Sequence, residues 1–232
     1  MRLPQCHAHA RDVRAAAQRH AATVPATVQE HGRFESARAG RCGRRGRFAF
    51  ATAIASVSHA NPVQPLSDIL ERGLSVIFCG INPGLGSASA GHHFSNASNR
   101  FWRVVHLAGF SPERIRPDDD RTLLRYGCGL TTAVSRATAR AAELSRSEFE
   151  AAASGFERKI QYHAPRYVAF LGKTALAAMS GKRDIQWGAQ SDTFGGARVW
   201  VLPNPSGLNR AFDLDSLVAA YRELRVAITS VP

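Results

Sequence analysis

Three short, uninterrupted apolar runs constrain the fold more than any other feature of this sequence. They are LSVIFCG (74–80), RYVAFLG (166–172) and ARVWVLP (197–203). Apolar runs of this length, without the alternation of a half-exposed strand, are typical of strands buried on both faces of a parallel sheet. CGLTTAV (128–134) is a further strand candidate. Helical segments separate these runs, which predicts an α/β protein, a three-layer α/β/α sandwich with a short, mainly parallel central sheet.

The segments between the strands carry helix signals. The clearest is Ser145 followed by Glu148, a capping box that predicts a helix ending before Pro165. A short helix is also predicted over 65–73, where Gly73 would stop it. Further helices are predicted over 98–110, 118–127, 173–179 and 213–228.

Positive charge is concentrated at the N-terminal end. The formal net charge is +12, and residues 1–60 contain ten Arg, no Lys and three acidic residues. This composition predicts a disordered basic extension over 1–60 and a folded domain over 61–232. A transit peptide, or an extension from an upstream start codon, also fits the first 60 residues. Because most of the excess charge lies there, charge alone is a weak indication of a nucleic-acid partner.

The four cysteines (Cys6, Cys42, Cys79 and Cys128) lie far apart, and no CxxC pair occurs. Their spacing is unlike that of zinc or iron–sulfur sites, so we expect no metal and no cofactor. Cys79 lies inside an apolar run and is expected in the core. No segment approaches the roughly 18 consecutive apolar residues of a membrane span. These features favour a protein of a reducing cytosol that has no membrane partner.

Two unusual loops follow the apolar runs. In CGINPGLGSASAGHHF (79–94) and in NPSGLNR (204–210), Asn-Pro occurs directly after the run, at Asn82 and Asn204. Ligands bind at the carboxyl ends of the strands in open parallel sheets, so both loops are predicted to lie side by side at that edge. An asparagine amide can position a water or read a base edge, but it cannot act as a strong base. The plainer interpretation is that Asn-Pro only initiates a turn.

Several common chemistries do not match these loops. GINPGLG fits neither of the glycine-rich phosphate-binding patterns, and Ser206 is not in a GxSxG nucleophile elbow. His92 and His93 are adjacent, which makes them point apart, and no matching carboxylate is near them in the sequence. The two histidines are either polar loop residues or functional groups, and the sequence leaves both interpretations open.

The motifs resemble those of one enzyme family. GINPG (80–84), GHHF (91–94), NRFW (99–102) and LPNPSGLNR (202–210) are similar, in order and spacing, to the mismatch-specific uracil/thymine-DNA glycosylases, the Mug/TDG branch of the uracil-DNA glycosylase superfamily. The likeness extends from about residue 74 to 228. It implies a monomeric, monofunctional DNA repair enzyme of the bacterial cytosol and nucleoid. Such an enzyme flips uracil mispaired with guanine out of double-stranded DNA and hydrolyses its N-glycosidic bond, with thymine and etheno-cytosine as further candidate substrates.

The resemblance also implies roles for single residues. Asn82 would hold the attacking water, and the ring of Phe94 would stack on the flipped base. The base pocket would comprise Ile81, Ser87, Phe94 and Asn204, with the backbone amides of Ile81 and Phe94 at the base edge. The second loop would enter the duplex, with Leu208 as the wedge, the backbones of Gly207 and Asn209 reading the widowed guanine, and Arg210 steadying the loop or a phosphate.

This sequence departs from the pattern of the efficient uracil glycosylases. They carry an acidic residue in the first motif and a histidine in the second, where this chain has Asn82 and Asn204. Catalysis would then rest on positioning and backbone hydrogen bonds, which predicts modest turnover. Thr132 stands where relatives carry Lys or Asn, which leaves the substrate preference open. Arg100 is a candidate phosphate contact, although an exposed helix charge is more often simply solvated.

Two other functions are compatible with the sequence. A non-catalytic protein of the same fold could sense mismatches or damaged bases. Asn82 together with Phe94 favours the enzyme, because a binder needs a wedge but no residue that holds water. An iron–sulfur glycosylase of the same superfamily is disfavoured by the cysteine spacing.

Overall fold

The computed structural model describes residues 65–230. The predicted basic extension over 1–60 lies outside the described residues. Within residues 65–230, none of the helices has the length and apolar character needed to cross a membrane.

The described residues build one five-stranded sheet. Its strand order is β2-β1-β3-β5-β4, with β1 at Val76–Gly80, β2 at Cys128–Thr132, β3 at Tyr167–Leu171, β4 at Gly188–Phe194 and β5 at Ala197–Leu202. All neighbouring strands pair in parallel except β4, which is antiparallel to β5. Every residue of β1, β2 and β3 is buried. The prediction of a mainly parallel sheet from continuous apolar runs is confirmed.

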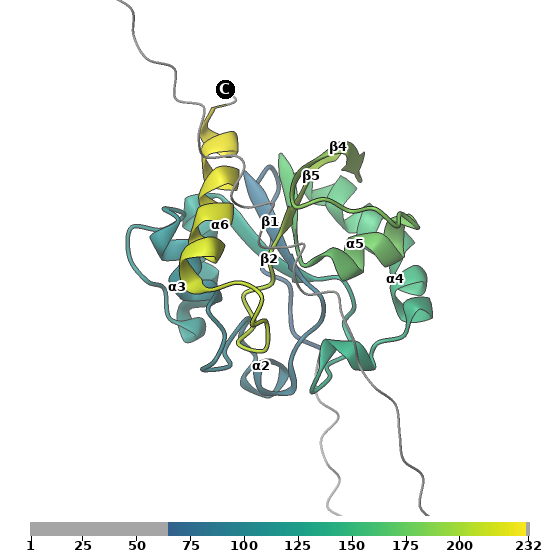
Figure 1. Cartoon of the computed structure of the whole chain (residues 1–232), viewed down its shortest axis with the longest axis horizontal. Coiled ribbons are helices and arrows are strands. Elements are labelled where there is room, and N and C mark those ends of the chain that lie inside the picture. The colour runs from purple at the N-terminus through teal and green to yellow at the C-terminus, as the bar shows by residue number, and fades with distance from the viewer. Residues whose placement is uncertain (1–64, 231–232) are drawn as a thin grey trace, which may run out of the picture. The chain divides into compact units, whose positions relative to one another are not determined.

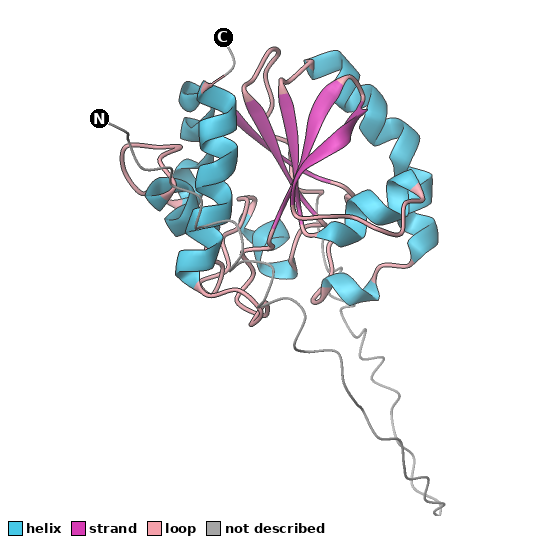
Figure 2. Ribbon diagram, turned by 45° about the horizontal axis from the view of Figure 1, so that its top comes forward, coloured by secondary structure: helices cyan, strands magenta, loops and turns pink. Residues whose placement is uncertain are grey.

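Helices cover both faces of this sheet (Figure 2). α3 (Phe101–Leu107) and α6 (Leu214–Thr229) lie on one face, and α4 (Arg146–His163) and α5 (Lys173–Ser180) lie on the other (Figure 1). Side chains of β1 alternate between two cores: Val76 and Phe78 pack towards α3 and α6, and Ile77 and Cys79 pack towards α4 and α5. The predicted three-layer α/β/α sandwich is therefore confirmed. Its physical reason is that a strand buried on both faces needs apolar side chains packed against each face.

The capping box predicted at Ser145 and Glu148 is present at the start of α4. Ser145 caps α4: its side chain accepts a hydrogen bond from the Glu148 backbone N–H, and the Glu148 carboxylate accepts one from the Ser145 backbone N–H. The helix ends at His163, and Ala164 follows in the left-handed conformation, with φ 45°, directly before Pro165. The segment predicted over 118–127 is a 3₁₀ helix (Pro117–Tyr126) with a kink at Asp119.

The predicted helix over 65–73 is wrong. This segment is extended, and Ile69 exchanges two backbone hydrogen bonds of 2.9 Å with Leu130 of β2. Since β2 is an edge strand, its outer backbone groups need partners, and Ile69 supplies them while its side chain is buried. Tertiary pairing thus overrides the weak helix propensity of a nine-residue segment.

Strand β4 was not predicted. It is short of apolar residues and mostly exposed, as an edge strand can be, and it turns back into β5 through Gly195 and Gly196, both with positive φ. Two glycines between two extended segments are a hairpin signal that the sequence does carry.

Candidate active site

The two Asn-Pro loops meet at the carboxyl edge of the sheet. They follow β1 and β5, which are not neighbours, because β3 lies between them. Gly172, just after β3, spans that gap: a Cβ atom built on it would lie 3.8 Å from Asn204 Cβ and 3.9 Å from Ile81 Cδ1. In Figure 1 the second loop, which precedes α6, lies at the same end of the sheet as α2 (Leu85–Ala90), which lies within the first loop. The expected juxtaposition at the sheet edge is therefore present, with Gly172 between the loops.

Asn82 is held by the segment that follows β2. Its Nδ2 donates to the backbone oxygen of Arg136 and to Oγ1 of Thr138, both at 2.8 Å. The Arg136 oxygen can only accept, so the NH₂ end of the amide must face it. Both amide hydrogens are then used, and the side-chain oxygen remains to accept a hydrogen bond from a water molecule.

The same segment clamps the backbone on either side of Asn82. Val134 N–H donates to the Ile81 oxygen at 3.0 Å, and Thr138 N–H donates to the Pro83 oxygen at 3.1 Å. Thr138 is buried, and its hydroxyl donates to the Arg140 oxygen at 2.9 Å. Asn82 therefore has little freedom to rotate, as positioning catalysis requires.

A charged pair supports this clamp from outside. The Arg136 guanidinium donates to both carboxylate oxygens of Glu148, at 2.6 and 3.1 Å, and to the Glu143 backbone oxygen at 3.0 Å. The hydrogen bond from Arg136 is the main cause that lowers the pKa of Glu148 to about 2. Because the pair is partly exposed, its role here is to fix the position of the Arg136 backbone rather than to add much stability.

Phe94 forms an aromatic shelf beside the end of β1. Its ring stacks on Phe101 of α3, with ring centroids 4.0 Å apart and planes 23° apart. A Cβ atom on Gly80 would lie 3.6 Å from the Phe94 ring and 3.7 Å from the Thr132 methyl group. Phe94 has φ 52°, a left-handed conformation that is uncommon for an aromatic residue and that marks functional sites more often than ordinary loops.

The two histidines anchor the loop that carries Phe94. The backbone N–H of His93 donates to Asp120 Oδ2 at 2.9 Å, its ring Nε2 lies 3.0 Å from the Ser67 oxygen, and its backbone oxygen accepts from the Trp102 indole at 3.1 Å. Burial lowers the pKa of His93. His92 Nδ1 lies 3.4 Å from the same Asp120 oxygen. These contacts favour the structural interpretation of both histidines.

Ser87 binds the residue that follows Phe94. It is buried in α2, and its hydroxyl oxygen accepts hydrogen bonds from the Ser95 backbone N–H at 3.2 Å and from the Ser95 hydroxyl at 3.3 Å. Since Ser95 directly follows Phe94, Ser87 helps to set the position of the aromatic ring.

The second loop is held by its own asparagines. Asn204 Oδ1 accepts from the Ser206 N–H at 2.9 Å, and the Asn204 backbone oxygen accepts from Asn209 Nδ2 at 2.8 Å. The closed loop presents Leu208, whose side chain is 77% exposed, at its tip. An apolar side chain this exposed on an ordered loop fits a role as a wedge. Arg210 is also exposed.

Gly207 allows this loop to approach the segment before α3. A Cβ atom at this position would lie 2.6 Å from the Ser98 backbone oxygen and 2.7 Å from Ser98 Cβ. These distances leave no room for a side chain, so the glycine is required by space.

Arg100 holds the second loop, a role that sequence reasoning missed. Its guanidinium donates four hydrogen bonds to backbone oxygens of this loop and of Phe212 just beyond it: from Nε to Pro205 (3.3 Å), from Nη1 to Phe212 (2.7 Å), and from Nη2 to Ser206 (3.0 Å) and Asn209 (2.9 Å). Four of the five guanidinium N–H groups are used in this way. The phosphate contact at Arg100 stays a prediction, with most of its donors already used within the protein.

Lys173, at the start of α5, directly follows Gly172. Its Nζ lies 4.7 Å from the centroid of the Trp187 ring, a cation–π contact, and Trp187 in turn packs edge-on against Phe212. Trp187 thus packs beside Phe212, just beyond the second loop.

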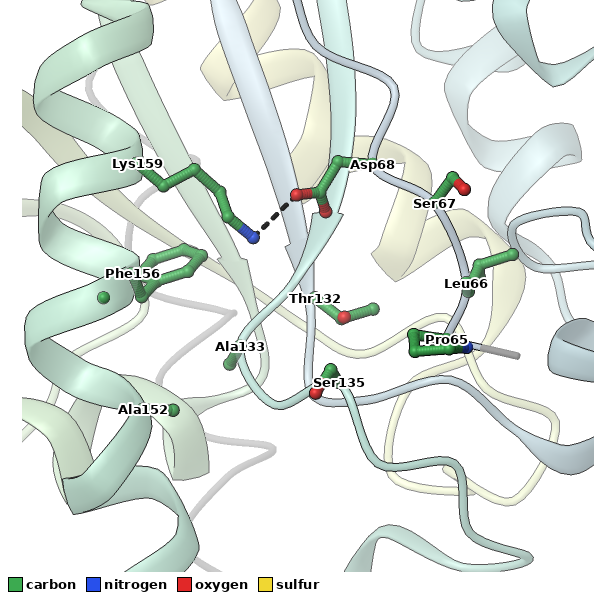
Figure 3. A pocket seen from close by; sticks show the side chains of 11 residues that line it. Pro65, Leu66, Ser67, Asp68, Thr132, Ala133, Ser135, Ala152, Phe156 and Lys159 are labelled. Carbon is green, nitrogen blue, oxygen red and sulfur yellow. Dashed lines mark ion pairs between the residues drawn. The ribbon is translucent and has the colours of Figure 1, made fainter. Parts of the chain in front are cut away.

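A cavity of about 450 Å³ opens beside Thr132 (Figure 3). It lies between the extended segment 65–68 and α4, and Lys159 of α4 pairs with Asp68 across it, Nζ to Oδ2, at 2.7 Å. The Thr131 hydroxyl donates to Asp68 Oδ1 at 2.6 Å. Thr132 lines this cavity, and its methyl group lies 3.7 Å from the Cβ position built on Gly80, which is 3.6 Å from the Phe94 ring.

Within residues 65–230, the His, Cys, Asp and Glu side chains form no group that could hold a metal ion. Cys79 and Cys128 are buried and free, and burial raises the pKa of both thiols, that of Cys128 to about 12. Both thiols are therefore protonated core residues at neutral pH, as expected for Cys79.

Comparison with known families defines the class of the protein. The model of the uracil DNA glycosylase superfamily matches residues 68–225, more than half of the chain, and the chain belongs to that superfamily. The family places it among the DNA glycosylases as a class.

A similar solved structure comes from Methanosarcina acetivorans: a solution NMR structure of a "putative Uracil DNA glycosylase", 18% identical, with a TM-score of 0.46. The match covers 70% of this chain and 98% of that one.

Proposed function

We propose that this protein is a mismatch-specific DNA glycosylase of the Mug/TDG branch. It would remove uracil, and also thymine or etheno-cytosine, paired with guanine in double-stranded DNA, acting as a monomer. The observation that carries this proposal is the fixed amide of Asn82, both of whose N–H groups are used, so that its oxygen can accept a hydrogen bond from water. The aromatic stack of Phe94 on Phe101 and the exposed side chain of Leu208 support it.

In the proposed reaction, Leu208 enters the duplex and compensates for the stacking lost when the mispaired nucleotide turns out. The flipped pyrimidine stacks on Phe94, and backbone amides near Ile81 and Phe94 contact its edge. The C1′–N1 bond breaks, the electron pair leaves with the base, and the sugar gains oxocarbenium character. A water that donates a hydrogen bond to Asn82 Oδ1 adds to C1′ and releases its proton to solvent. The departing base anion takes up a proton.

The proposed site contains no strong base. Asn82 and Asn204 are both neutral, so the enzyme stabilises the transition state by position and by hydrogen bonds rather than by a carboxylate. We therefore expect modest turnover, with a preference for bases that leave easily or pair weakly. Flipping a base out of the duplex costs a few kcal/mol, and the cost is lowest for a mispaired base. Selectivity for mismatches then arises from this lower cost.

A strand-nicking assay tests this function. Duplexes that carry one G·U, G·T, A·U or G·etheno-cytosine pair are incubated with the protein and then cleaved at abasic sites with alkali. We expect G·U to be nicked, A·U to be nicked less, and Asn82→Ala to be inactive on every duplex. Tight binding to mismatched duplexes without nicking would favour a mismatch-binding protein instead. Full activity of Asn82→Ala would exclude the proposed mechanism.

A further inference from the structure

The tripeptide Asn99–Phe101 joins the two halves of the candidate site. Arg100 immediately precedes α3, and its backbone N–H donates to the Pro205 oxygen at 3.0 Å. Its guanidinium adds four hydrogen bonds to the second loop and to Phe212. The next residue, Phe101, carries the ring on which Phe94 stacks. One short segment therefore contacts both the wedge loop and the aromatic shelf.

The carbonyl groups that Arg100 binds are placed on both sides of the loop tip. Pro205 and Ser206 precede Gly207–Leu208, and Asn209 and Phe212 follow it. A side chain that binds both arms of a loop fixes the distance between them, and with it the direction of the tip. Lysine could not replace this arrangement, because its single ammonium group lacks the planar set of five donors.

The tip itself has few other restraints outside its own loop. Leu208 is 77% exposed, and Gly207 contributes only its close approach to Ser98. Among residues 65–230, the other hydrogen bonds of the tip stay within the loop, such as that from the Leu208 N–H to Ser206 Oγ at 3.3 Å. Arg100 is therefore the main connection between the wedge and the folded body of the protein.

We propose that Arg100 is a positioning residue that holds Leu208 in the conformation needed to enter DNA and keeps it in register with the Phe94 shelf. This inference rests on the proposed function. It assigns to Arg100 a part in nucleotide flipping that is separate from bond cleavage, which belongs to Asn82.

The test compares Arg100→Lys with Arg146→Lys, the same substitution at an exposed arginine of α4. Both variants keep the net charge. Flipping is measured by the fluorescence of 2-aminopurine placed next to uracil in a G·U duplex, and cleavage is measured in single turnover on that duplex and on single-stranded uracil DNA. We expect Arg100→Lys to lower duplex cleavage and the flipping signal together, on the order of 10- to 100-fold. Single-stranded cleavage and the Arg146→Lys variant should stay within about 2-fold of wild type, the scatter expected when no coupled contact is lost.

A double-mutant comparison separates positioning from a general structural role. Leu208→Ala removes the wedge itself, so adding Arg100→Lys to it should lower duplex cleavage by no more than about 2-fold further, because the two residues act as one unit. Independent, multiplicative losses would overturn the proposal. Equal losses on duplex and single-stranded DNA would also overturn it.

Hydrogen exchange keeps the outcomes distinct. Exchange of the amides of residues 206–212 should become faster in Arg100→Lys, while exchange in β1 and β3 stays unchanged. Unchanged exchange in the loop would contradict the inference even if the variant were less stable. If the wild-type protein cleaves none of the substrates, the proposed function fails first. If it cleaves G·U and Arg100→Lys flips normally, only the role of Arg100 fails.

Discussion

The side-chain amide of Asn82 donates a hydrogen bond of 2.8 Å to the hydroxyl of Thr138. The two residues are 56 positions apart and belong to the loops after β1 and β2, which are neighbouring parallel strands. The Thr138 hydroxyl donates its own hydrogen to the Arg140 oxygen, so it can only accept from Asn82. The orientation of the candidate catalytic amide is therefore determined by the loop after β2.

Replacing Thr138 tests this relationship. Thr138→Val removes the acceptor and leaves the Asn82 amide with one partner, so we expect cleavage of a G·U duplex to fall by up to about 10-fold, the equivalent of one net hydrogen bond. Duplex binding should not change. Thr138→Ser keeps the hydroxyl and should retain nearly full activity. Single-turnover rates beside binding constants check this, and equal rates for both variants would contradict it.

Replacing Asn82 by aspartate should not create a more efficient glycosylase. The Arg136 backbone oxygen lies 2.8 Å from Nδ2 and can only accept, so a carboxylate oxygen at that place would face another acceptor. We expect Asn82→Asp to be at least about 10-fold slower than wild type on G·U, because a hydrogen bond is lost and a polar group is left unsatisfied. The pH–rate profile of the variant provides the measurement. A rate above wild type would mean that the amide clamp does not govern this position.

Gly207 can be tested by adding a single methyl group. In Gly207→Ala the new Cβ would lie 2.6 Å from the Ser98 oxygen, so the loop must shift. We expect duplex cleavage to fall on the order of 10- to 100-fold, as a displacement of about 1 Å can cause. Gly86→Ala is the matched control, since Gly86 has open space around its Cβ position. Similar kinetics for the two variants would show that the close approach to Ser98 is dispensable.

Because the pKa of His93 is lowered, we expect the folded protein to lose stability at mildly acidic pH. Burial lowers its pKa from 6.5, while Asp120 and Asp68 oppose this shift and His92 adds to it. Below pH 6.5 the unfolded state therefore binds more protons than the folded state, and stability decreases as pH falls from 6.5 towards the lowered pKa. The slope should approach about 1.4 kcal/mol per pH unit for one proton. Above about pH 7.5 the contribution of this group is constant.

Chemical denaturation at pH 7.5, 6.5 and 5.5 measures this dependence. The His93→Gln variant serves as control, because glutamine offers an N–H donor for the Ser67 oxygen but does not titrate in this range. The difference in unfolding free energy between wild type and variant should shrink or change sign as pH falls. The lowered pKa values of Glu148, Asp213 and Asp118 act only at more acidic pH, below the ordinary range of carboxyl groups. A pH-independent difference would contradict the prediction.

Much of the fold could be predicted because its signals are local. The apolar runs at β1, β3 and β5 record burial on both faces, and the Ser145–Glu148 capping box marks the start of α4. The segment 65–73 could not be predicted in the same way, because its conformation depends on the free edge of β2. Strand β4 was not predicted because it is mostly exposed, and an exposed edge strand carries no continuous apolar run.

The candidate site shows the same division. Sequence motifs singled out Asn82, Phe94 and Leu208, and the structure brings the loops that carry them to one edge of the sheet. The pocket role of Ser87 stays a prediction, and its hydroxyl accepts hydrogen bonds from Ser95, next to Phe94. Arg100 was a candidate phosphate contact, and the structure shows its donors bound to Asn209 of the second loop and to Phe212 just beyond it. In both cases the residue type predicted a polar contact, but the sequence did not predict which group the side chain binds.

By itself, the sequence determined the layers of the sheet and the positions of the two Asn-Pro loops, because burial, chain direction and turn chemistry depend on neighbouring residues. Only the tertiary structure decided how those groups are held. The amide of Asn82 is fixed by Thr138, and the loop around Leu208 is fixed by Arg100, whose hydrogen bond to Phe212 spans 112 positions. Contacts over such separations are set by the packing of whole strands and helices, which no local pattern encodes.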